Sequence, residues 1–402
     1  MKNASIVPPA FTMNSSSFWY AVATLVATIV GVGIFGLPYA AWHAGFFVAA
    51  LYLGVLFFVF AILHLMFGEI ILRTRERHRL AGYVARYVNH GAGRVVVVTT
   101  FVGMLGGMLA YLLVGGQFLS VLAGAAGISV PLWGWYGIFW FVCTLVIAFG
   151  LKAVERSEMF MLVLMVAAVF FLFAAGVPKV NPAHFFGFTP GNFFLPYGIT
   201  LFALAGTAAI PAVRDILVGV EGAMRRAIVL GTAIPVVFYL LFTAVVVGVS
   251  GPAVSEDAIS GLAAALGEGV VAVGALFGIL VVATSYVIFG LYLRDTLTYD
   301  LGARRGLTLL LVGAVPLVLV AAQNIGFFTL IGLLGAVVGG IESVFLVLAY
   351  SRARVSGGDQ TPAYALSIPR FVLWAMIALF LCGAAYATAG EWRSLLHLIH
   401  AV

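Results

Sequence analysis

The segment VGVGIFGLPYA, Val30 to Ala40, places three glycines and a proline inside an apolar run with the length of a membrane-spanning helix. Glycine weakens a helix, and proline removes one of its backbone donors. Unwinding here would let the next half-helix begin with free N–H groups and the positive end of its dipole, which together bind anions. The segment predicts a carboxylate site formed by Gly31, Val32, Gly33 and Ile34.

A second apolar segment, LFALAGTAAIPAVRD, repeats this spacing, because Gly206 precedes Pro211 by as many positions as Gly33 precedes Pro38. Carbonyl groups freed at such a break accept hydrogen bonds from an ammonium group. A zwitterionic amino acid would then be bound at both ends by backbone alone. The residues expected around the second break are Phe202, Ala203, Ala205 and Gly206. The alternative is that the glycines only allow close helix packing.

Side chains near the two breaks would set specificity. Phe202 is the candidate for an aromatic wall or gate, and Tyr111 and Gln117 are weaker candidates. Tyr111 could equally form an interhelical hydrogen bond. Since no large polar or charged group lies near the breaks, an apolar or aromatic amino acid is favoured over an acidic or basic one.

Adjacent hydroxyls stand at Thr284 and Ser285, inside the apolar segment VVATSYVIFG. Hydroxyl oxygens are ligands of the kind that a small hard cation prefers. The alternative is that each hydroxyl bonds back to the preceding turn of its own helix.

Glu342, in GGIESVF, is a carboxylate inside a predicted span, and such residues are functional candidates. A role in proton coupling or gating competes with a simple ion pair to Arg352 or Arg354. His64, also within a span, is expected to be a hydrogen-bonded structural residue rather than a proton carrier. Ion pairs at helix ends are expected for Glu69 with Arg73, for Asp215 with Arg214, and for Asp295 with Arg294.

Composition determines the class of protein that carries these residues. Of 402 residues, 64% are hydrophobic and 8% are charged, which excludes a soluble domain. A membrane helix needs about 20 apolar residues, so the charge-free stretches predict roughly eleven helices. The predicted spans are 18–43, 46–72, 94–125, 131–150, 158–177, 195–217, 223–250, 269–298, 304–323, 326–350 and 368–389.

Orientation follows from the basic residues, which favour the cytoplasmic side of a membrane. With the N-terminus inside, alternating spans place all but two of the 20 Lys and Arg residues in the cytoplasm, the exceptions being Lys179 and Arg393. The protein is therefore expected in the cell (inner) membrane with an external C-terminus. The net charge of +6 reflects this topology and not nucleic-acid binding.

The interrupted spans are the first members of two consecutive sets of five, and they start on opposite sides of the membrane. Paired breaks of this kind indicate a transporter built from inverted repeats. The expected organisation is a cytoplasmic tail (1–17), a first repeat (18–180, broken near 31–34), a second repeat (190–350, broken near 203–207), and a final part (351–402) with a cytoplasmic loop, an eleventh helix and a short external end.

The motif GVGIFGLPYA followed by AGF resembles the first helix of amino acid permeases in the amino acid–polyamine–organocation (APC) superfamily. It is most similar to the amino acid/auxin permease branch and its bacterial aromatic amino acid permease relatives, and FALAGTAAIP resembles their sixth helix. The resemblance implies the LeuT fold, with two inverted five-helix repeats and here an added helix. One departure is Ala212, where that branch often has an acidic residue.

The resemblance also implies a cation site. In sodium-coupled relatives, a hydroxyl pair in the eighth helix and backbone carbonyls bind Na⁺ against the first helix. The matching residues here are Ala27, Val30, Val281, Thr284 and Ser285. Some proton-coupled relatives instead have a lysine in the fifth span, and residues 158–177 contain none, which favours sodium slightly.

Other classes fit less well. A membrane enzyme would need clustered His, Asp, Glu or Ser, whereas the acidic residues here are scattered along helix ends. A nutrient sensor or an amino acid exchanger with the same fold stays open. We expect a secondary transporter that moves amino acids by alternating access, with Na⁺ or H⁺ as coupling ion, no other cofactor, lipid and substrate as partners, and function as a monomer.

Overall fold

The computed structural model describes residues 15–149, 167–295, 297, 304–322 and 326–400, and the regular structure within them is entirely helical. Among these residues, eight helices are long and apolar enough to cross a membrane, and one bent pair would form a further span. Shorter apolar helices are Ala167–Lys179 and Gly306–Ala321. The all-α prediction is thus confirmed for the described residues, and these helices are compatible with a polytopic membrane protein. The total of about eleven spans stays a prediction, since the fifth lies partly outside the described residues.

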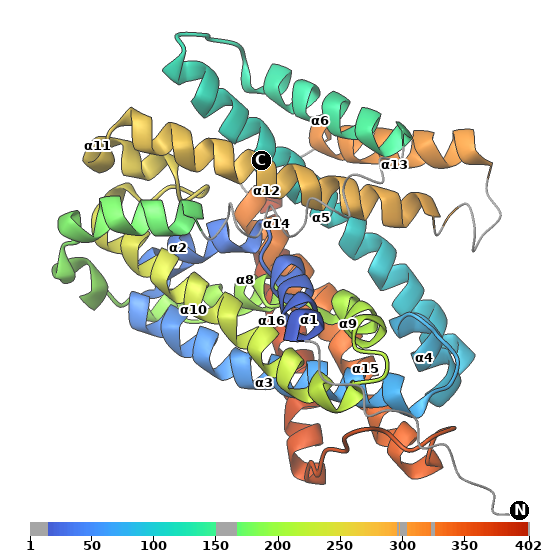
Figure 1. Cartoon of the computed structure of the whole chain (residues 1–402). Helices are drawn as coiled ribbons and strands as arrows, with labels where there is room; N and C mark the ends of the chain where they lie inside the picture. Colours follow the sequence, from blue (N-terminus) through green and yellow to red (C-terminus); the bar gives the residue numbers. More distant parts are fainter. Residues whose placement is uncertain (1–14, 150–166, 296, 298–303, 323–325, 401–402) are drawn as a thin grey trace, which may run out of the picture.

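The chain forms its helices in the order shown in Figure 1. The helices used below are α1 (Ser15–Ile29), α2 (Gly33–Ala44), α3 (Phe46–Arg73), α4 (Leu80–Tyr87), α5 (His90–Ala125), α6 (Leu132–Phe149), α8 (Leu195–Ala203), α9 (Ile210–Ile216), α10 (Met224–Ser250), α12 (Glu268–Asp295), α13 (Arg305–Ala321), α14 (Phe327–Leu333), α15 (Gly340–Ser356) and α16 (Arg370–His400).

The helices pack in two groups, which Figure 1 shows as two layers. The first group, here called the bundle, consists of α1, α2, α3, α8, α9 and α10. The second group, here called the scaffold, consists of α5, α6, α12 and α13. Helices α14 and α15 contact both groups, and α16 packs along α15.

Contacts within these groups pair the earlier helices with the later ones. In the bundle, α2 packs against α8, α1 against α9, and α3 against α10. In the scaffold, α5 packs against α12 and α6 against α13. Most helices of the first half of the chain therefore pack against helices of the second half, although α4 and α6 pack mainly against α5, and the two halves share one core.

Helices α14 and α15 are joined by a π-helix, Leu334–Gly339, which packs closely against α8. A Cβ on Gly335 would lie 1.9 Å from the carbonyl oxygen of Gly198, and a Cβ on Gly198 would lie 2.2 Å from that of Gly332. Such distances exclude any side chain, so glycine allows direct backbone contact between the bundle and this segment.

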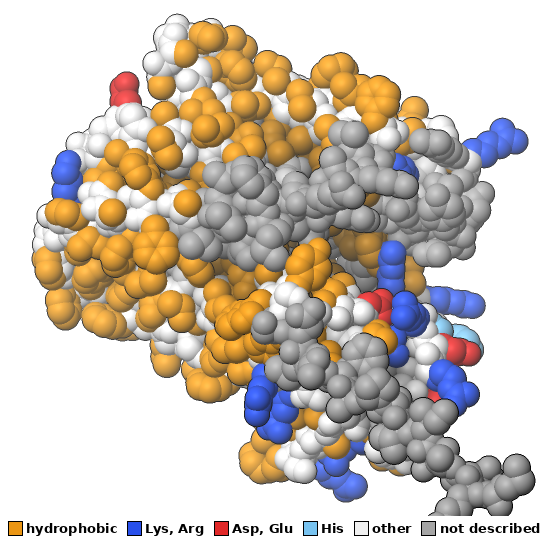
Figure 2. Space-filling view, viewed as in Figure 1, with side chains coloured by type: hydrophobic (Ala, Val, Ile, Leu, Met, Phe, Trp, Pro, Cys, Tyr) orange, Lys and Arg blue, Asp and Glu red, His pale blue; other side chains and the backbone are white. Residues whose placement is uncertain are grey.

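Charged side chains gather at one end of the molecule. Figure 2 shows most of the Lys and Arg atoms near the part that Figure 1 labels α4, α9 and α15, while apolar side chains cover much of the remaining described surface. We call this end, which carries Arg73, Arg77, Arg86, Arg214 and Arg352, the basic end. Its helices are joined by polar contacts, including Arg77 to Asp215 (3.3 Å) and Arg86 to Asp359 (2.6 Å).

Candidate functional site

The first break separates α1 from α2, whose axes differ by 57°. Helix α1 ends at Ile29 and α2 begins at Gly33, so the interruption ends slightly earlier than the sequence suggests. The amides of Ile34 and Phe35 donate to the carbonyls of Gly31 and Val32. In the described part of the chain, the amides of Gly31, Val32 and Gly33 have no backbone acceptor. The Gly31 amide instead bonds to the hydroxyl of Tyr239, so the N–H groups of Val32 and Gly33 are the two left without an acceptor here in the described structure.

The second break follows α8, which ends at Ala203, and helical structure resumes with a short turn at Thr207–Ala209 before α9. The carbonyl of Phe202 already accepts from the amide of Ala205. Among the described residues, the carbonyls of Leu204 and Ala205 have no donor. Among the residues expected around the second break, Ala205 thus has a carbonyl without a donor in the described structure.

The two breaks lie against each other. A Cβ on Gly33 would lie 2.7 Å from Cα of Ala203, and a Cβ on Gly206 would lie 2.5 Å from the side chain of Ile29. A side chain at Gly33 would collide with the backbone of α8, and one at Gly206 would have to displace the side chain of Ile29 at the end of α1. Free donors at the first break and free acceptors at the second therefore belong to one site.

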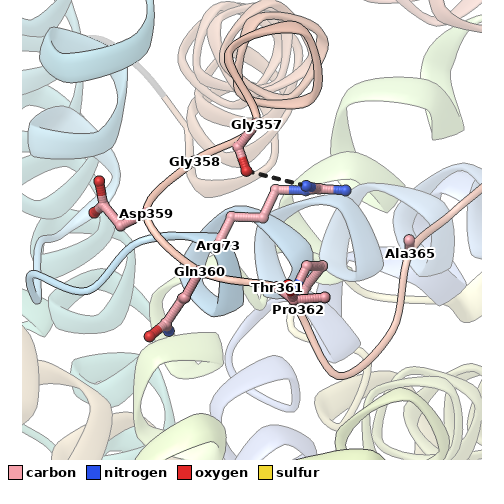
Figure 3. Close-up of a pocket in the computed structure, with 8 residues that line it drawn as sticks. All are labelled: Arg73, Gly357, Gly358, Asp359, Gln360, Thr361, Pro362 and Ala365. Atoms are coloured by element: carbon pink, nitrogen blue, oxygen red, sulfur yellow. Dashed lines mark hydrogen bonds between the residues drawn. The ribbon is translucent and has the colours of Figure 1, made fainter.

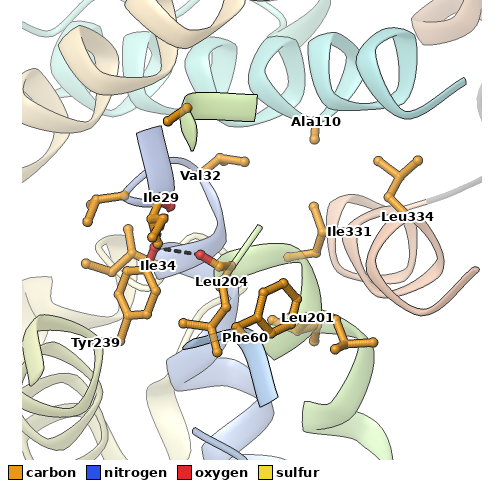
Figure 4. Close-up of a cluster of buried hydrophobic side chains, with 14 of the residues drawn as sticks. Ile29, Val32, Ile34, Phe60, Ala110, Leu201, Leu204, Tyr239, Ile331 and Leu334 are labelled. Carbon is orange, nitrogen blue, oxygen red and sulfur yellow. Dashed lines mark hydrogen bonds between the residues drawn. The ribbon is translucent and has the colours of Figure 1, made fainter. Parts of the chain in front are cut away.

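A tyrosine that the sequence reasoning missed links the breaks. Tyr239, from α10, is fully buried, and its hydroxyl lies 2.7 Å from the carbonyl oxygen of Ile29 and 2.9 Å from that of Ala203 (Figure 4). A hydroxyl has one hydrogen, so these two carbonyls share it. Tyr239 is one of several tyrosines in apolar segments, and nothing in its sequence neighbourhood distinguishes it.

Tyr111, from α5, brings the scaffold to the first break. Its hydroxyl would lie 3.4 Å from a Cβ on Gly31, its side chain interacts with that of Ser285, and its ring is 5.3 Å from that of Phe289. Tyr111 thus faces the break and also makes the interhelical contact considered from the sequence.

The other candidates for pocket walls are less constrained. Phe202 lies at the end of α8 with its side chain half-buried, between the buried residues Leu201 and Ala203. Gln117 has a buried side-chain oxygen without a hydrogen-bond partner in the described structure. Phe202 therefore lies at the second break, whereas Gln117 is on α5, about 9 Å beyond Tyr111 at 1.5 Å per residue.

His64, from α3, lies at the second break. Its ring is fully buried, Nδ1 is 3.0 Å from the hydroxyl of Thr232, and Nε2 has no partner in the described structure. Its Cε1 would lie 3.2 Å from a Cβ on Gly206. His64 is bonded, as the sequence suggests, but through one nitrogen only.

The expected cation site has one hydroxyl that is already engaged. Thr284 donates to the carbonyls of Leu280 (3.0 Å) and Val281 (2.9 Å), which is the back-bonded alternative. Val281 would thus offer a carbonyl that already accepts a hydrogen bond. Ser285 faces Tyr111 instead, beside the break. Within the described residues, no group of three or more His, Cys, Asp or Glu side chains could hold a metal ion.

Glu342 pairs with hydroxyls and not with arginine. Its carboxylate accepts from Thr100 (2.8 Å) and Thr99 (3.4 Å) on α5. Arg352 donates to the carbonyl of Val88, and Arg354 contacts the hydroxyl of Tyr350. The pairing of Glu342 with either arginine is therefore wrong. Thr100 is about 16 Å along α5 from Tyr111, at 1.5 Å per residue.

At the basic end, the loop between α15 and α16 folds back onto the end of α3. Glu69 is fully buried, pairs with Arg73 at 2.8 Å and accepts from the amide of Leu366. Arg73 also contacts the carbonyl of Gly357, within a pocket that this loop lines (Figure 3). We call this arrangement the clasp.

The clasp contains one of the expected ion pairs, Glu69 with Arg73. A second one, Arg214 with Asp215, is also present at 3.3 Å, whereas the side chain of Asp295 lies outside the described residues. Arg73 is about 13 Å along α3 from His64, at 1.5 Å per residue. The clasp pocket is thus separate from the two breaks.

Comparison with known proteins adds a family. Residues 14–384 match the model of the tryptophan/tyrosine permease family, which belongs to the APC superfamily of amino acid permeases. No individual curated protein matches the chain. The match spans both breaks, the bundle and the scaffold, so it covers the whole candidate site.

Proposed function

Because this chain belongs to the tryptophan/tyrosine permease family, a family of transporters and not of enzymes, we propose that it moves aromatic amino acids across a membrane by secondary active transport. The observation that carries the proposal is the contact of two helix breaks. Free amides of Val32 and Gly33 suit the carboxylate of an amino acid, and free carbonyls of Leu204 and Ala205 suit its ammonium group.

The same arrangement supports alternating access. Both breaks belong to the bundle, while Tyr111 and Ser285 reach the site from the scaffold. Helices α1–α2 pack against α8–α9, α3 against α10, α5 against α12, and α6 against α13. This pairing is the pattern expected of two inverted five-helix repeats. In this proposal the bundle rocks against the scaffold, and a sodium or proton gradient drives net uptake. The LeuT-type arrangement and the branch of the superfamily remain part of the proposal.

The test is uptake of labelled tryptophan and tyrosine into liposomes that contain the purified protein. We expect uptake to be lost in Gly33→Ala, because the added Cβ would collide with Ala203 at 2.7 Å. Gly54→Ala is the matched control, since a Cβ on Gly54 of α3 would meet nothing within 4 Å.

Each result decides between functions. Binding of amino acids without uptake would favour a nutrient sensor, and uptake only against a preloaded amino acid would favour an exchanger. If neither binding nor uptake occurs with any amino acid, the proposed function is wrong.

A further inference from the structure

The hydrogen bonds around His64 determine its tautomer. Thr232 donates its hydroxyl hydrogen to the carbonyl of Ile228 at 2.8 Å. A hydroxyl has a single hydrogen, so Thr232 can only accept from His64, 3.0 Å away. The proton of the neutral imidazole is therefore on Nδ1, and Nε2 has a lone pair.

That lone pair has no donor in the described structure, although the side chain is fully buried. Leaving a buried acceptor unpaired typically costs about 1–3 kcal/mol. Thr232 is on α10 and His64 on α3, so two helices of the bundle hold the ring in this orientation. The molecule thus maintains a basic nitrogen without a partner beside Gly206.

We propose that His64 Nε2 is the site of the proton whose movement drives transport. This inference rests on the proposed function and specifies its coupling ion. The ring is fully buried, packs against Gly206 and lies 5.7 Å from that of Phe60, so no substrate atom fits there in this structure, whereas a proton needs no added volume. Protonation would convert Nε2 into a donor, and the second break supplies free acceptors in the carbonyls of Leu204 and Ala205.

In the described structure, the titratable groups on α1, α3, α9 and α10 form no hydrogen bond or ion pair with the ring. Helix α3 carries Glu69, which is paired with Arg73, and α9 carries Arg214 and Asp215, which pair with each other. Helix α10 carries Tyr239, bonded to two carbonyls, as well as Arg225 and Arg226 near its start, and α1 carries Tyr20. Thr232 is the partner of His64 in the described structure.

The proposal implies the following cycle. When the breaks are open to one side of the membrane, a proton from water binds the lone pair on Nε2, and the imidazolium donates from both nitrogens. The new N–H group would bond to a carbonyl of the adjacent second break and so link α3 to the segment that also binds the ammonium group in this proposal. After the bundle opens to the other side, Nε2 returns the proton to water, and no other atom is exchanged.

The experiment compares accumulation with exchange in proteoliposomes loaded with a pH indicator. With one proton per substrate, a gradient of one pH unit supports about tenfold accumulation of labelled tryptophan. We expect His64→Gln to lower the accumulation ratio to about one and to abolish the substrate-dependent pH change inside. Exchange of labelled for unlabelled tryptophan should continue. His78→Gln, at a histidine outside the spans, is the control.

A second pair of variants tests the site if His64→Gln does not fold. Thr232→Val removes the acceptor of Nδ1, whose bond is stronger when the ring is charged, so half-maximal uptake should move to lower pH by about one unit. Thr243→Val is the matched control, because this buried threonine of α10 has a hydroxyl without a partner in the described structure.

Several results would overturn the inference while leaving the transporter in place. These are full gradient-driven accumulation in His64→Gln, an unchanged pH dependence in Thr232→Val, and uptake by the unaltered protein that follows sodium alone. Loss of accumulation in Glu342→Gln, with accumulation retained in His64→Gln, would assign the proton to Glu342. Absence of both uptake and exchange in the unaltered protein would contradict the proposed function itself.

Discussion

At the scale of single residues, the site depends on backbone groups that a few side chains hold in place. Tyr239 is the clearest case, because its single hydroxyl hydrogen is shared by the carbonyls of Ile29 and Ala203. These carbonyls end the helices that precede the two breaks. The tyrosine therefore fixes the relative position of the breaks while leaving each carbonyl only partly satisfied.

Tyr239→Phe should accordingly destabilise the protein and reduce uptake. Loss of the hydroxyl leaves two buried carbonyls without a side-chain donor, which we expect to cost about 1–3 kcal/mol. Thermal unfolding in detergent, followed with a thiol-reactive dye, measures this change. Tyr286→Phe is the control, since that buried hydroxyl bonds to no carbonyl in the described structure. Equal unfolding temperatures for the two variants would contradict the bridging role.

Thr284 and Ser285 are neighbours with different environments, and their variants should differ. Thr284→Ala should change the sodium dependence of uptake by no more than about twofold, because the Thr284 hydroxyl bonds within its own helix. Ser285→Ala should weaken substrate binding, because Ser285 contacts Tyr111 beside the first break. Uptake kinetics at varied sodium and tryptophan concentrations measure both effects. A tenfold rise in the sodium requirement of Thr284→Ala would restore the cation site expected from the sequence.

At the scale of elements, the clasp connects the end of α3 to the loop before α16. Its central ion pair is largely buried, with 0% of the Glu69 side chain and 14% of the Arg73 side chain exposed. The amide of Leu366 donates to Glu69, and the hydroxyl of Tyr364 donates to the carbonyl of Leu65. The loop is therefore held at several points along α3.

Glu69→Gln should therefore loosen this loop. Removing one partner of a buried pair costs about 3–5 kcal/mol, whereas an exposed pair contributes about 0–1 kcal/mol. Limited proteolysis of the loop, residues 357–369, and the unfolding temperature report the change. Glu76→Gln, in an exposed pair with Arg86, is the control. Unaltered proteolysis in Glu69→Gln would show that the loop is held by its backbone contacts alone.

At the scale of the whole molecule, charge indicates orientation. The basic end gathers Arg73, Arg77, Arg86, Arg214 and Arg352, and the rule that positive charge stays inside predicts that this end faces the cytoplasm. Lys179 lies in a different region, where it donates to the carbonyl of Ala265.

Single cysteines in a chain whose Cys143 and Cys382 are replaced by alanine test this orientation. Gly187→Cys, at an exposed position with no atom within 4 Å of the added Cβ, should react with a membrane-impermeant maleimide in intact cells. Ser356→Cys, exposed at the end of α15, should react only after permeabilisation. The reverse pattern would invert the topology.

The sequence by itself determined the helices and the positions of the breaks. Long apolar runs must form helices in a bilayer, because each backbone group needs a partner there. Glycine and proline weaken a helix locally, so the helix breaks near Gly33 and Gly206 could be predicted without knowledge of any tertiary contact. The APC superfamily, and hence a transporter, also followed from the motif around Gly33 and is confirmed by the family match.

Tertiary structure alone decided which groups meet. Several contacts join residues far apart in the chain. Gly33 packs against Ala203, Tyr239 bonds to carbonyls at both breaks, and Glu342 bonds to Thr100 instead of an arginine. The unpaired Nε2 of His64 also depends on tertiary structure, because the hydroxyl of Thr232 fixes the tautomer only once α3 and α10 are packed. Local composition determines where a helix forms or breaks, but the partner of a polar group depends on how the helices pack.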